Sequence, residues 1–300
     1  MVHTPVLKKE VLEYLDPKDN ENFIDATVGE AGHTMLILEK NGPNGKVLGI
    51  DQDLHQIENA KLEIANYKER VILINDSYSN IGEIVERVNF KPVDGILLDL
   101  GYSSWQMKQS KRGFSFMKDE YLDMRYNLNS VVTAEKIINE YTQSDLERIL
   151  KNYGEERFAK QIAKKIVGER KIKRIKTTFE LMDVITRAIP MFAQSKHRGL
   201  SNWAKAQIGA KSFQALRIAV NSELDNLTNF LSVALSVLSS GGRLVIISFH
   251  SLEDRIVKNF FKEHISSINI LTKKPIIAQS DEVLENPRSR SAKLRAITKK

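Results

Sequence analysis

The sequence predicts an α/β fold in which a mainly parallel, seven-stranded sheet is interrupted by an all-helical insertion. Short apolar runs alternate with helical segments through roughly the first hundred residues, which is typical of parallel strands buried on both faces. No convincing strand follows between residues 106 and 211, and apolar runs then return. We therefore expect one discontinuous domain, residues 1–105 and 212–300, and one inserted helical domain, residues 106–211.

Four strands are expected in the first part, each ending at or beside an acid. Their sequences are NFIDA, KVLGIDQD, RVILIND and VDGILLDL, and the acids are Asp25, Asp51, Asp76 and Asp99. The segments HTMLILEK, LHQIENAKLEIAN and SNIGEIVERV lie between them and are expected as helices. Ligands of open parallel sheets bind outside the carboxyl ends of the strands, so four carboxylates there predict a binding crevice. The alternative is that one or two of these acids are helix N-caps.

The insertion carries helix signals. Ser144 and Glu147 have the spacing of a capping box, and Gly154 stands where the same helix should end. The next segment, RFAKQIAKKI, sorts apolar and basic residues to opposite sides of a helix. A third helix is expected to begin at Thr177 and to end at Pro190.

The last part returns to sheet. SFQALRIAVNSELDNLTNFLSVALSVL is expected as one long amphipathic helix, and RLVIISFHS as a fifth buried strand. INILTKKPIIA and AKLRAITKK are expected as the final two strands, a candidate hairpin at the edge of the sheet.

The composition excludes several classes of protein. The chain has no cysteine, which excludes disulfides, thiolate zinc sites and cysteine nucleophiles. No stretch approaches the ~20 apolar residues of a membrane-spanning helix, and the first residues lack the apolar core of a signal peptide. We therefore expect a cytoplasmic protein with no membrane partner. No metal site is predicted, because His3, His55, His197 and His264 show no metal-ligand spacing.

Basic residues outnumber acidic residues by 45 to 38, and they cluster. Residues 157–176 hold nine basic residues and one acid, and residues 286–300 hold six basic residues and no acid. Such clusters predict binding to a phosphate backbone. The candidate RNA contacts are Lys160, Lys164, Arg288 and Arg290. The alternative for the first cluster is a solvated helix face.

The turn after the first strand discriminates between nucleotide ligands. The chain has no GxxxxGK[ST] motif, which excludes a P-loop. The turn, GEAGH, lacks the third glycine of a dinucleotide site, and its Glu30 would repel a pyrophosphate. S-adenosylmethionine has a sulfonium and an ammonium group and no phosphate, so it suits an acid-rich crevice. Asp51 would then accept from the ribose hydroxyls, Asp76 and Tyr78 would lie by the adenine, and Asp99 by the methyl group.

Several motifs make the chain similar to a known family. They are DATVGEAGHT, LLDLGYSS, RGFSFM, LDMR, YGEERFAKQIA, SFQALRIAVNSEL, GGRLVIISFHSLEDRIVK and NPRSRSAKLR. In this order they resemble the bacterial 16S ribosomal RNA cytosine-N4 methyltransferases, from about His3 to the C-terminus. The resemblance implies a Rossmann-like class I fold that uses S-adenosylmethionine, with an inserted helical domain. It also implies methylation of the exocyclic N4 amine of a cytosine in the decoding region of 16S rRNA.

The resemblance also implies cofactor contacts, which fall on Ala31, Gly32, His33, Asp51, Tyr78, Asp99 and Gln106. Asp25, Gly29 and Asp76 join this set from their places at the strand ends. The sequence departs from the family pattern at Ala31, Tyr78, Trp105 and residues 201–212.

A cytosine amine is a weak nucleophile, so the enzyme must align it with the methyl donor and accept a hydrogen bond from it. Asp99 and Ser103 in DLGYSS are the catalytic candidates, and His250 could accept the released proton or bind phosphate. Tyr102 is a candidate stacking surface. Candidate walls for a base taken out of its stack are Trp105, Phe114 and Phe116, with loop packing as the alternative.

Two other functions compete with this interpretation. A catalytically inactive ribosome-assembly factor could keep the fold and bind 16S rRNA or the small subunit. A nicotinamide oxidoreductase is disfavoured by the incomplete glycine pattern. The sequence leaves the oligomeric state open, a homodimer included, as it does the choice between free rRNA and an assembled subunit.

Overall fold

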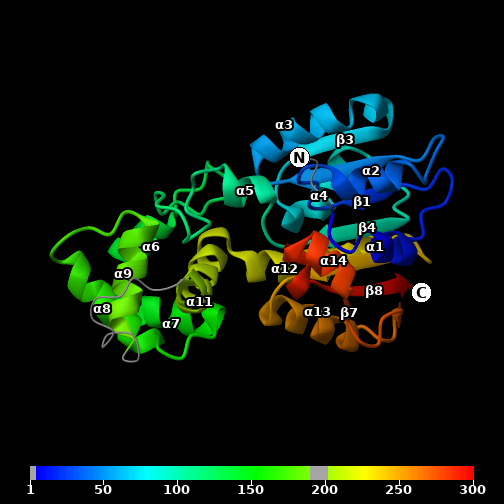
Figure 1. The fold of residues 1–300 in the computed structure, drawn as a ribbon. Coiled ribbons are helices and arrows are strands. Elements are labelled where there is room, and N and C mark those ends of the chain that lie inside the picture. Colours follow the sequence, from blue (N-terminus) through cyan, green and yellow to red (C-terminus); the bar gives the residue numbers. More distant parts are fainter. Residues whose placement is uncertain (1–4, 190–201) are drawn as a thin grey trace. The chain divides into compact units, whose positions relative to one another are not determined.

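The computed structural model describes residues 5–189 and 202–300, without the side chains of residues 104, 108 and 202–208. The chain forms two compact units (Figure 1). The sheet unit comprises residues 1–101 and 224–300, and the helical unit comprises residues 102–223. The expected boundaries, at 105/106 and 211/212, both lie inside the helical unit. The second boundary differs most, because the helix that contains residues 212–221 packs in the helical unit.

The α/β class with a mainly parallel sheet is confirmed, but the sheet has eight strands rather than seven. The strands are β1 Phe23–Asp25, β2 Val47–Asp51, β3 Val71–Asn75, β4 Gly95–Asp99, β5 Arg243–Ser248, β6 Ile268–Ile270, β7 Ile276–Ile277 and β8 Lys293–Lys299. Their order is β3-β2-β1-β4-β5-β8-β6, and β7 also pairs with β8. The first five strands are parallel, and β8 runs antiparallel to its neighbours.

The extra strand arises because the run INILTKKPIIA does not stay extended. β6 pairs with the end of β8 and β7 pairs with its start, with Lys273, Lys274 and Pro275 between them. Proline has no N–H for a ladder. Two short strands therefore share the edge position that one strand was expected to fill.

Helices cover both faces of the sheet. They are α1 Lys8–Leu15, α2 Gly32–Leu38, α3 Leu54–Glu63, α4 Ile81–Arg87, α12 Glu223–Val237, α13 Ser251–Glu263 and α14 Ser280–Glu285. One apolar core joins α4, α12 and α13 to strand residues such as Ile24 and Ile96. A second core joins α1, α2 and α3 to Phe23 and Leu97, the alternate residues of the same strands. Side chains alternate along strands, so each strand supplies both cores.

The helical unit has its own apolar core. Its helices are α5 Ser104–Lys108, α6 Ala134–Glu140, α7 Gln143–Gly154, α8 Ala159–Arg170, α9 Thr178–Ala188 and α11 Asn202–Asn221. The capping box at Thr177 and Glu180 is present at the start of α9. The expected box at Ser144 is wrong, because Thr142 caps α7 by accepting from Asp145 N–H.

The long helix expected after the insertion is two helices. Ser222 adopts a left-handed conformation, with φ of 49°, between α11 and α12. At this junction the Arg217 guanidinium, whose side chain is 12% exposed, contacts both carboxylate oxygens of Glu223, at 2.9 and 3.0 Å. Glu223 raises the pKa of Arg217 against the lowering effect of burial. Serine is not a regular helix breaker, so this break carried no sequence signal.

Within residues 5–189 and 202–300, every helix is too short or too polar to span a bilayer.

Candidate functional site

The turn between β1 and α2 is held by the neighbouring strands. Gly29 and Ala31 have left-handed backbones, with φ of 50° and 61°. Gly29 N–H donates to Asp51 Oδ2 at 3.0 Å, at the end of β2. Asp99 N–H donates to Thr27 Oγ1 at 2.7 Å, at the end of β4. Two strands therefore fix the turn, which explains why Ala31 keeps a conformation that costs a non-glycine residue ~1 kcal/mol.

Gly32 begins α2 and lies against the N-terminal segment. A Cβ at Gly32 would lie 2.7 Å from Pro5 Cγ, so a side chain there would displace the segment. A few residues on, Leu7 N–H donates to Glu282 Oε1 at 2.7 Å. Close packing thus requires glycine here, and the cofactor contact of Gly32 stays a prediction.

Asp25 joins β1 to α2. Its side chain is buried, and it accepts from Thr34 Oγ1 at 2.7 Å and from Thr27 N–H at 3.2 Å. Burial raises the pKa of Asp25, and these two hydrogen bonds oppose that rise. The carboxylate is used inside the protein, so the geometry argues against Asp25 as a direct cofactor contact.

Asp51 combines a structural role with partial exposure. It accepts from Gly29 N–H and, at 2.9 Å, from Asp53 N–H. Burial raises the pKa of Asp51 to about 7, and the two hydrogen bonds oppose that rise. Each carboxylate oxygen can accept a further hydrogen bond. Asp51 can therefore hold the turn and accept from ligand hydroxyls together.

Within residues 5–189 and 202–300, Glu30, His33 and Asp99 present buried polar atoms that have no hydrogen-bond partner. These atoms are Glu30 Oε1, His33 Nδ1, His33 Nε2 and Asp99 Oδ1. His33 Nε2 lies 3.6 Å from Asp99 Oδ2, beyond hydrogen-bond distance. Buried polar atoms are nearly always paired, so such a group at the strand ends indicates a ligand. Two of the three side chains are carboxylates, which fits a cationic ligand.

The expected adenine site after β3 is largely built into the protein. Asp76 Oδ1 accepts from Ser77 N–H at 2.7 Å and from Asn80 Nδ2 at 2.8 Å. Tyr78 is 8% exposed, and its ring packs edge-on against Phe230 at 5.7 Å between centroids. Asp76 therefore shapes the turn, and little of the Tyr78 ring is available to an adenine.

His250 is the N-cap of α13. Its Nδ1 accepts from Glu253 N–H at 3.4 Å, and Glu253 Oε2 accepts from Phe249 N–H at 2.8 Å and His250 N–H at 3.2 Å. His250 and Glu253 together form a capping box at the start of this helix. His250 Nε2 lies 3.2 Å from Glu253 Oε1, so the geometry favours a capping role for His250 over proton transfer.

The aromatic residues of the helical unit pack on one another. Phe114 is buried between Tyr102 and Tyr126, with centroids 6.0 and 5.4 Å away. The Arg217 guanidinium lies 4.9 Å from the Tyr102 centroid. Phe116 packs edge-on against Phe213 at 5.2 Å. The Tyr102 and Phe114 rings therefore pack inside the helical unit, which favours loop packing over a wall for Phe114 and leaves Tyr102 stacked on protein groups.

Ser103 and Gln106 form a capping box at the start of α5. Gln106 N–H donates to Ser103 Oγ at 3.1 Å, and Ser103 N–H donates to Gln106 Oε1 at 2.9 Å. The Arg112 guanidinium lies over the Trp105 ring, 5.5 Å from the ring centroid. These contacts give Ser103 and Gln106 a helix-forming role, and their catalytic and cofactor roles stay predictions.

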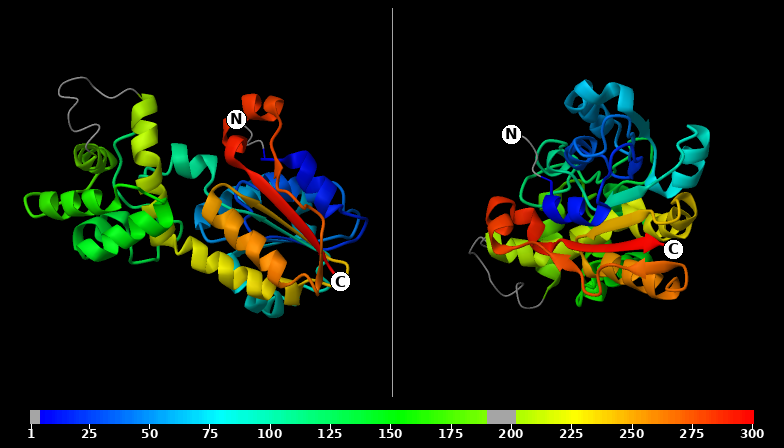
Figure 2. Two further views of the ribbon diagram at one scale, coloured as in Figure 1. Left: turned by 90° about the horizontal axis from the view of Figure 1, so that it is seen from below. Right: turned by 90° about the vertical axis from the view of Figure 1, so that its right-hand side faces the viewer.

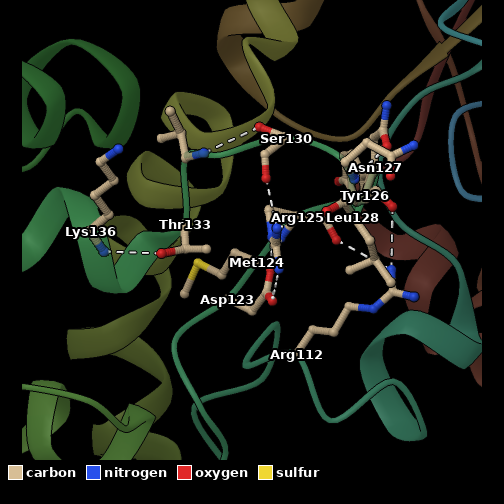
Figure 3. Close-up of polar contacts among 12 residues, drawn as sticks. Arg112, Asp123, Met124, Arg125, Tyr126, Asn127, Leu128, Ser130, Thr133 and Lys136 are labelled. Carbon is tan, nitrogen blue, oxygen red and sulfur yellow. Dashed lines mark hydrogen bonds and ion pairs between the residues drawn. The ribbon is translucent and has the colours of Figure 1, made fainter.

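The LDMR segment is held by its own arginine (Figure 3). Arg125 contacts both oxygens of Asp123 at 2.8 Å and donates to Leu128 O at 2.8 Å and Ser130 O at 2.6 Å. Arg112 Nη1 donates to the carbonyls of Arg125 and Tyr126, both at 3.3 Å. Both arginines are occupied in fixing this loop.

The basic cluster at residues 157–176 divides into paired and unpaired side chains. Lys165 forms an ion pair with Glu169, and Lys173 forms one with Glu180. Arg174 forms ion pairs with both Glu135 and Glu140. Arg170 donates to two carbonyls, of Ile138 and Tyr141. Lys160 and Lys164 are exposed, and in the described residues neither has an ion pair. Arg157, Lys171 and Lys176 are exposed as well, so Lys160 and Lys164 are two of several members of the cluster that are accessible to an external anion.

The second cluster, at residues 286–300, is more engaged. Lys293 and Arg295 pair with Asp254, at 3.9 and 2.6 Å. Arg288 and Arg290 lie in a short 3₁₀ helix, Pro287–Ser291, where Arg290 is exposed and Arg288 is half-buried with contacts of its own. Arg290 is thus the more accessible of the two.

The sequence missed the residues that orient the acids. Thr34 holds Asp25 and Thr27 holds the backbone of Asp99. Both lie within the motif DATVGEAGHT, but no spacing rule links a threonine to a strand-end acid. The unpaired state of Glu30 was likewise unpredictable, because it depends on what the fold leaves around the side chain.

The chain as a whole is similar to known proteins. The family model "MraW methylase family" matches residues 1–300. Ribosomal RNA small subunit methyltransferase H of Sulfurihydrogenibium sp. (strain YO3AOP1) is 44% identical over 98% of this chain and 97% of that protein. The protein of the same name from Thermotoga neapolitana is 44% identical over 98% and 95%. An rRNA methylase structure from Streptococcus thermophilus has a TM-score of 0.45 and 10% identity, covering 97% of this chain and 93% of that one.

We expect Asp25→Asn to change how stability depends on pH. The raised pKa of Asp25 means that, above the unfolded-state value of about 4, the native state holds a proton that the unfolded state has lost. Wild-type stability therefore falls as pH rises from that value through the folded pKa. The variant lacks this loss, so its free energy of unfolding relative to wild type should rise with pH. Urea titrations between pH 5 and 8 measure it, and a constant difference would contradict the assignment.

Proposed function

Since the chain belongs to the MraW methylase family, we propose that it methylates the exocyclic N4 amine of a cytosine in the decoding region of 16S rRNA. At the coarser level, it is an S-adenosylmethionine-dependent methyltransferase of small-subunit ribosomal RNA. Its substrate is free 16S rRNA or the assembled subunit, and we place it in the cytoplasm with that substrate.

One observation carries the proposal: the unpaired buried atoms of Glu30, His33 and Asp99 at the strand ends. When bound, S-adenosylmethionine supplies a methyl group on a sulfonium, and it carries a second cation in its ammonium group. Unpaired carboxylate oxygens stabilise such charges, whereas they would repel a pyrophosphate. Asp51, partly exposed at the end of β2, can accept from the ribose hydroxyls. The residues present therefore fit this donor.

Asp99 is the residue that we propose for the amine. Its Oδ1 has no partner and can accept an amine N–H, which favours a lone pair localised on nitrogen. Its backbone N–H is held by Thr27, so the backbone that carries the acceptor is fixed before the substrate binds. His33, 3.6 Å away, can stabilise the negative charge of Asp99 when protonated.

A catalytically inactive assembly factor is the weaker candidate. Such a protein has no use for buried acceptors without partners, since each costs about 1–3 kcal/mol of stability. We propose that the helical unit recognises the RNA, through the exposed Lys160 and Lys164.

Transfer of a labelled methyl group to purified small ribosomal subunits tests the function. Nucleoside analysis of the product should show the label in N4-methylated cytidine, and none in adenosine or uridine. Asp99→Asn should lower kcat by about a hundredfold, the scale of a lost proton acceptor, while still binding S-adenosylhomocysteine. Label in another nucleoside, or an active Asp99→Asn variant, would overturn the assignment.

Donor binding should depend on the ionisation of Asp51. The ribose hydroxyls favour the carboxylate, so binding below the pKa of about 7 should release a proton. Affinity should fall by up to about tenfold per pH unit below that value. Calorimetry of S-adenosylhomocysteine in buffers of different ionisation enthalpy counts the protons. Asp51→Asn should bind more weakly and lose that share of proton release, and equal release by both proteins would refute this role.

Charge reversal of Lys160 and Lys164 tests the helical unit. Lys160→Glu with Lys164→Glu should weaken RNA binding and reduce the slope of log affinity against log salt by about 1.4 for a single strand. The matched control, Lys136→Glu with Lys151→Glu, changes the same charge elsewhere in the unit and should have a smaller effect. If the Lys160/Lys164 variant lost affinity for S-adenosylhomocysteine as well, α8 would be structural instead.

A further inference from the structure

A basic cavity opens on the sheet unit between the end of α13 and the loop that joins β6 to β7. Its volume is about 710 Å³, within the range of small-molecule sites, ~300–1,000 Å³. The basic side chains that line it are Lys258, Lys262, Lys273, Lys274, Arg295 and Lys300. Among the described residues of its lining, none is acidic. In Figure 1, α13, β7 and β8 lie along one margin of the unit, and Figure 2 shows β8, in red, beside the orange α13.

Two of these basic groups are engaged by the protein. Arg295 Nε lies 2.6 Å from Asp254 Oδ1. Lys300 Nζ donates to Ile265 O at 3.0 Å and Ser266 O at 3.2 Å, just after the end of α13. Their charges are therefore partly satisfied inside the fold.

The other four lysines are exposed and unpaired. Lys258 and Lys262 lie one turn apart on α13, and Lys273 and Lys274 lie on the β6–β7 loop. Within the described chain, none of the four has an ion pair or hydrogen bond from its ammonium group. Four like charges around one cavity repel one another, and an anion placed between them would remove that repulsion.

Part of the cavity wall is apolar. Ile265, which is 53% exposed, and the half-buried Ile270 and Pro275 line it, whereas Phe261 is only 2% exposed and offers almost none of its ring. Lysines beside accessible apolar side chains suit a flat ring that carries a phosphate. Inorganic phosphate would contact only the lysines, and an RNA duplex would present only its phosphate backbone to the cavity. The combination fits a nucleotide in a single strand.

The cavity is separate from the crevice at the strand ends. Thr298 in β8 pairs with Arg243 at the start of β5, and Lys300 lies two residues further on. Asp99 pairs with Ile247, four residues along β5 from Arg243, which is roughly 13 Å at strand spacing. Of the lining residues on β8, Arg295 lies nearer, opposite Ile246, but its guanidinium is paired with Asp254. We propose that this cavity binds a single-stranded nucleotide of the RNA substrate, remote from the base that is methylated. This inference rests on the proposed function, which makes RNA the substrate.

Charge reversal on the loop tests the cavity in the full-length protein. Lys273→Glu with Lys274→Glu should raise KM for small ribosomal subunits by roughly tenfold, with kcat and S-adenosylhomocysteine affinity unchanged. The matched control is Lys61→Glu with Lys68→Glu, exposed lysines near β3 at the opposite edge of the sheet. Equal KM values for the two variants would overturn the proposal.

Direct binding separates the cavity from the proposed function. With a fluorescein-labelled oligouridylate, the loop variant should lose about 1.4 from the salt slope, or about 0.7 per phosphate contact. An equal loss with an RNA duplex, or full competition by inorganic phosphate, would overturn the assignment to a nucleotide. If wild type bound the oligouridylate through these lysines but transferred no methyl group to any RNA, the proposed function would fail and the cavity would stand.

Discussion

The β1–α2 turn depends on hydrogen bonds that reach it from two neighbouring strands. Asp51 holds Gly29 and Thr27 holds the backbone of Asp99, so the ends of β2 and β4 are tied to the same loop. Inside the turn, Asp25 fastens Thr34. These contacts are satisfied by the protein alone, so the crevice is shaped before any ligand arrives. Such pre-organisation lowers the cost of binding and fixes the acceptors in place.

The strand-end acids resemble one another in sequence but differ in role. Asp25 and Asp76 use their carboxylates within the protein, Asp51 divides its oxygens between the turn and the crevice, and Asp99 keeps one oxygen unpaired. In the described residues, Asp99, Glu30 and His33 each keep a buried polar atom without a hydrogen-bond partner in or beside the β1–α2 turn. Buried polar atoms without partners lower the stability of the fold, and such atoms are typical of sites where a ligand binds.

The sequence predicted what depends on local pattern and missed what depends on contacts across the chain. Apolar runs ending in acids located the first four strands, and the Thr177 box located α9. Thr142 caps α7 in place of the expected Ser144, because both residues have capping chemistry and only the backbone decides between them. The break at Ser222 had no local signal, and the split between β6 and β7 lies at Pro275, whose effect on the run was not anticipated. The sequence offered Phe114 as a candidate wall for a base taken out of its stack, but its ring stacks between those of Tyr102 and Tyr126.

A crystal soaked with S-adenosylmethionine and NAD together tests most directly whether the acids select a cationic donor over a phosphate-rich one. The account predicts electron density for S-adenosylmethionine alone, with its ribose on Asp51 and its sulfonium on the Asp99 side of the turn. Density for NAD in that crevice, or S-adenosylmethionine bound away from both acids, would contradict it.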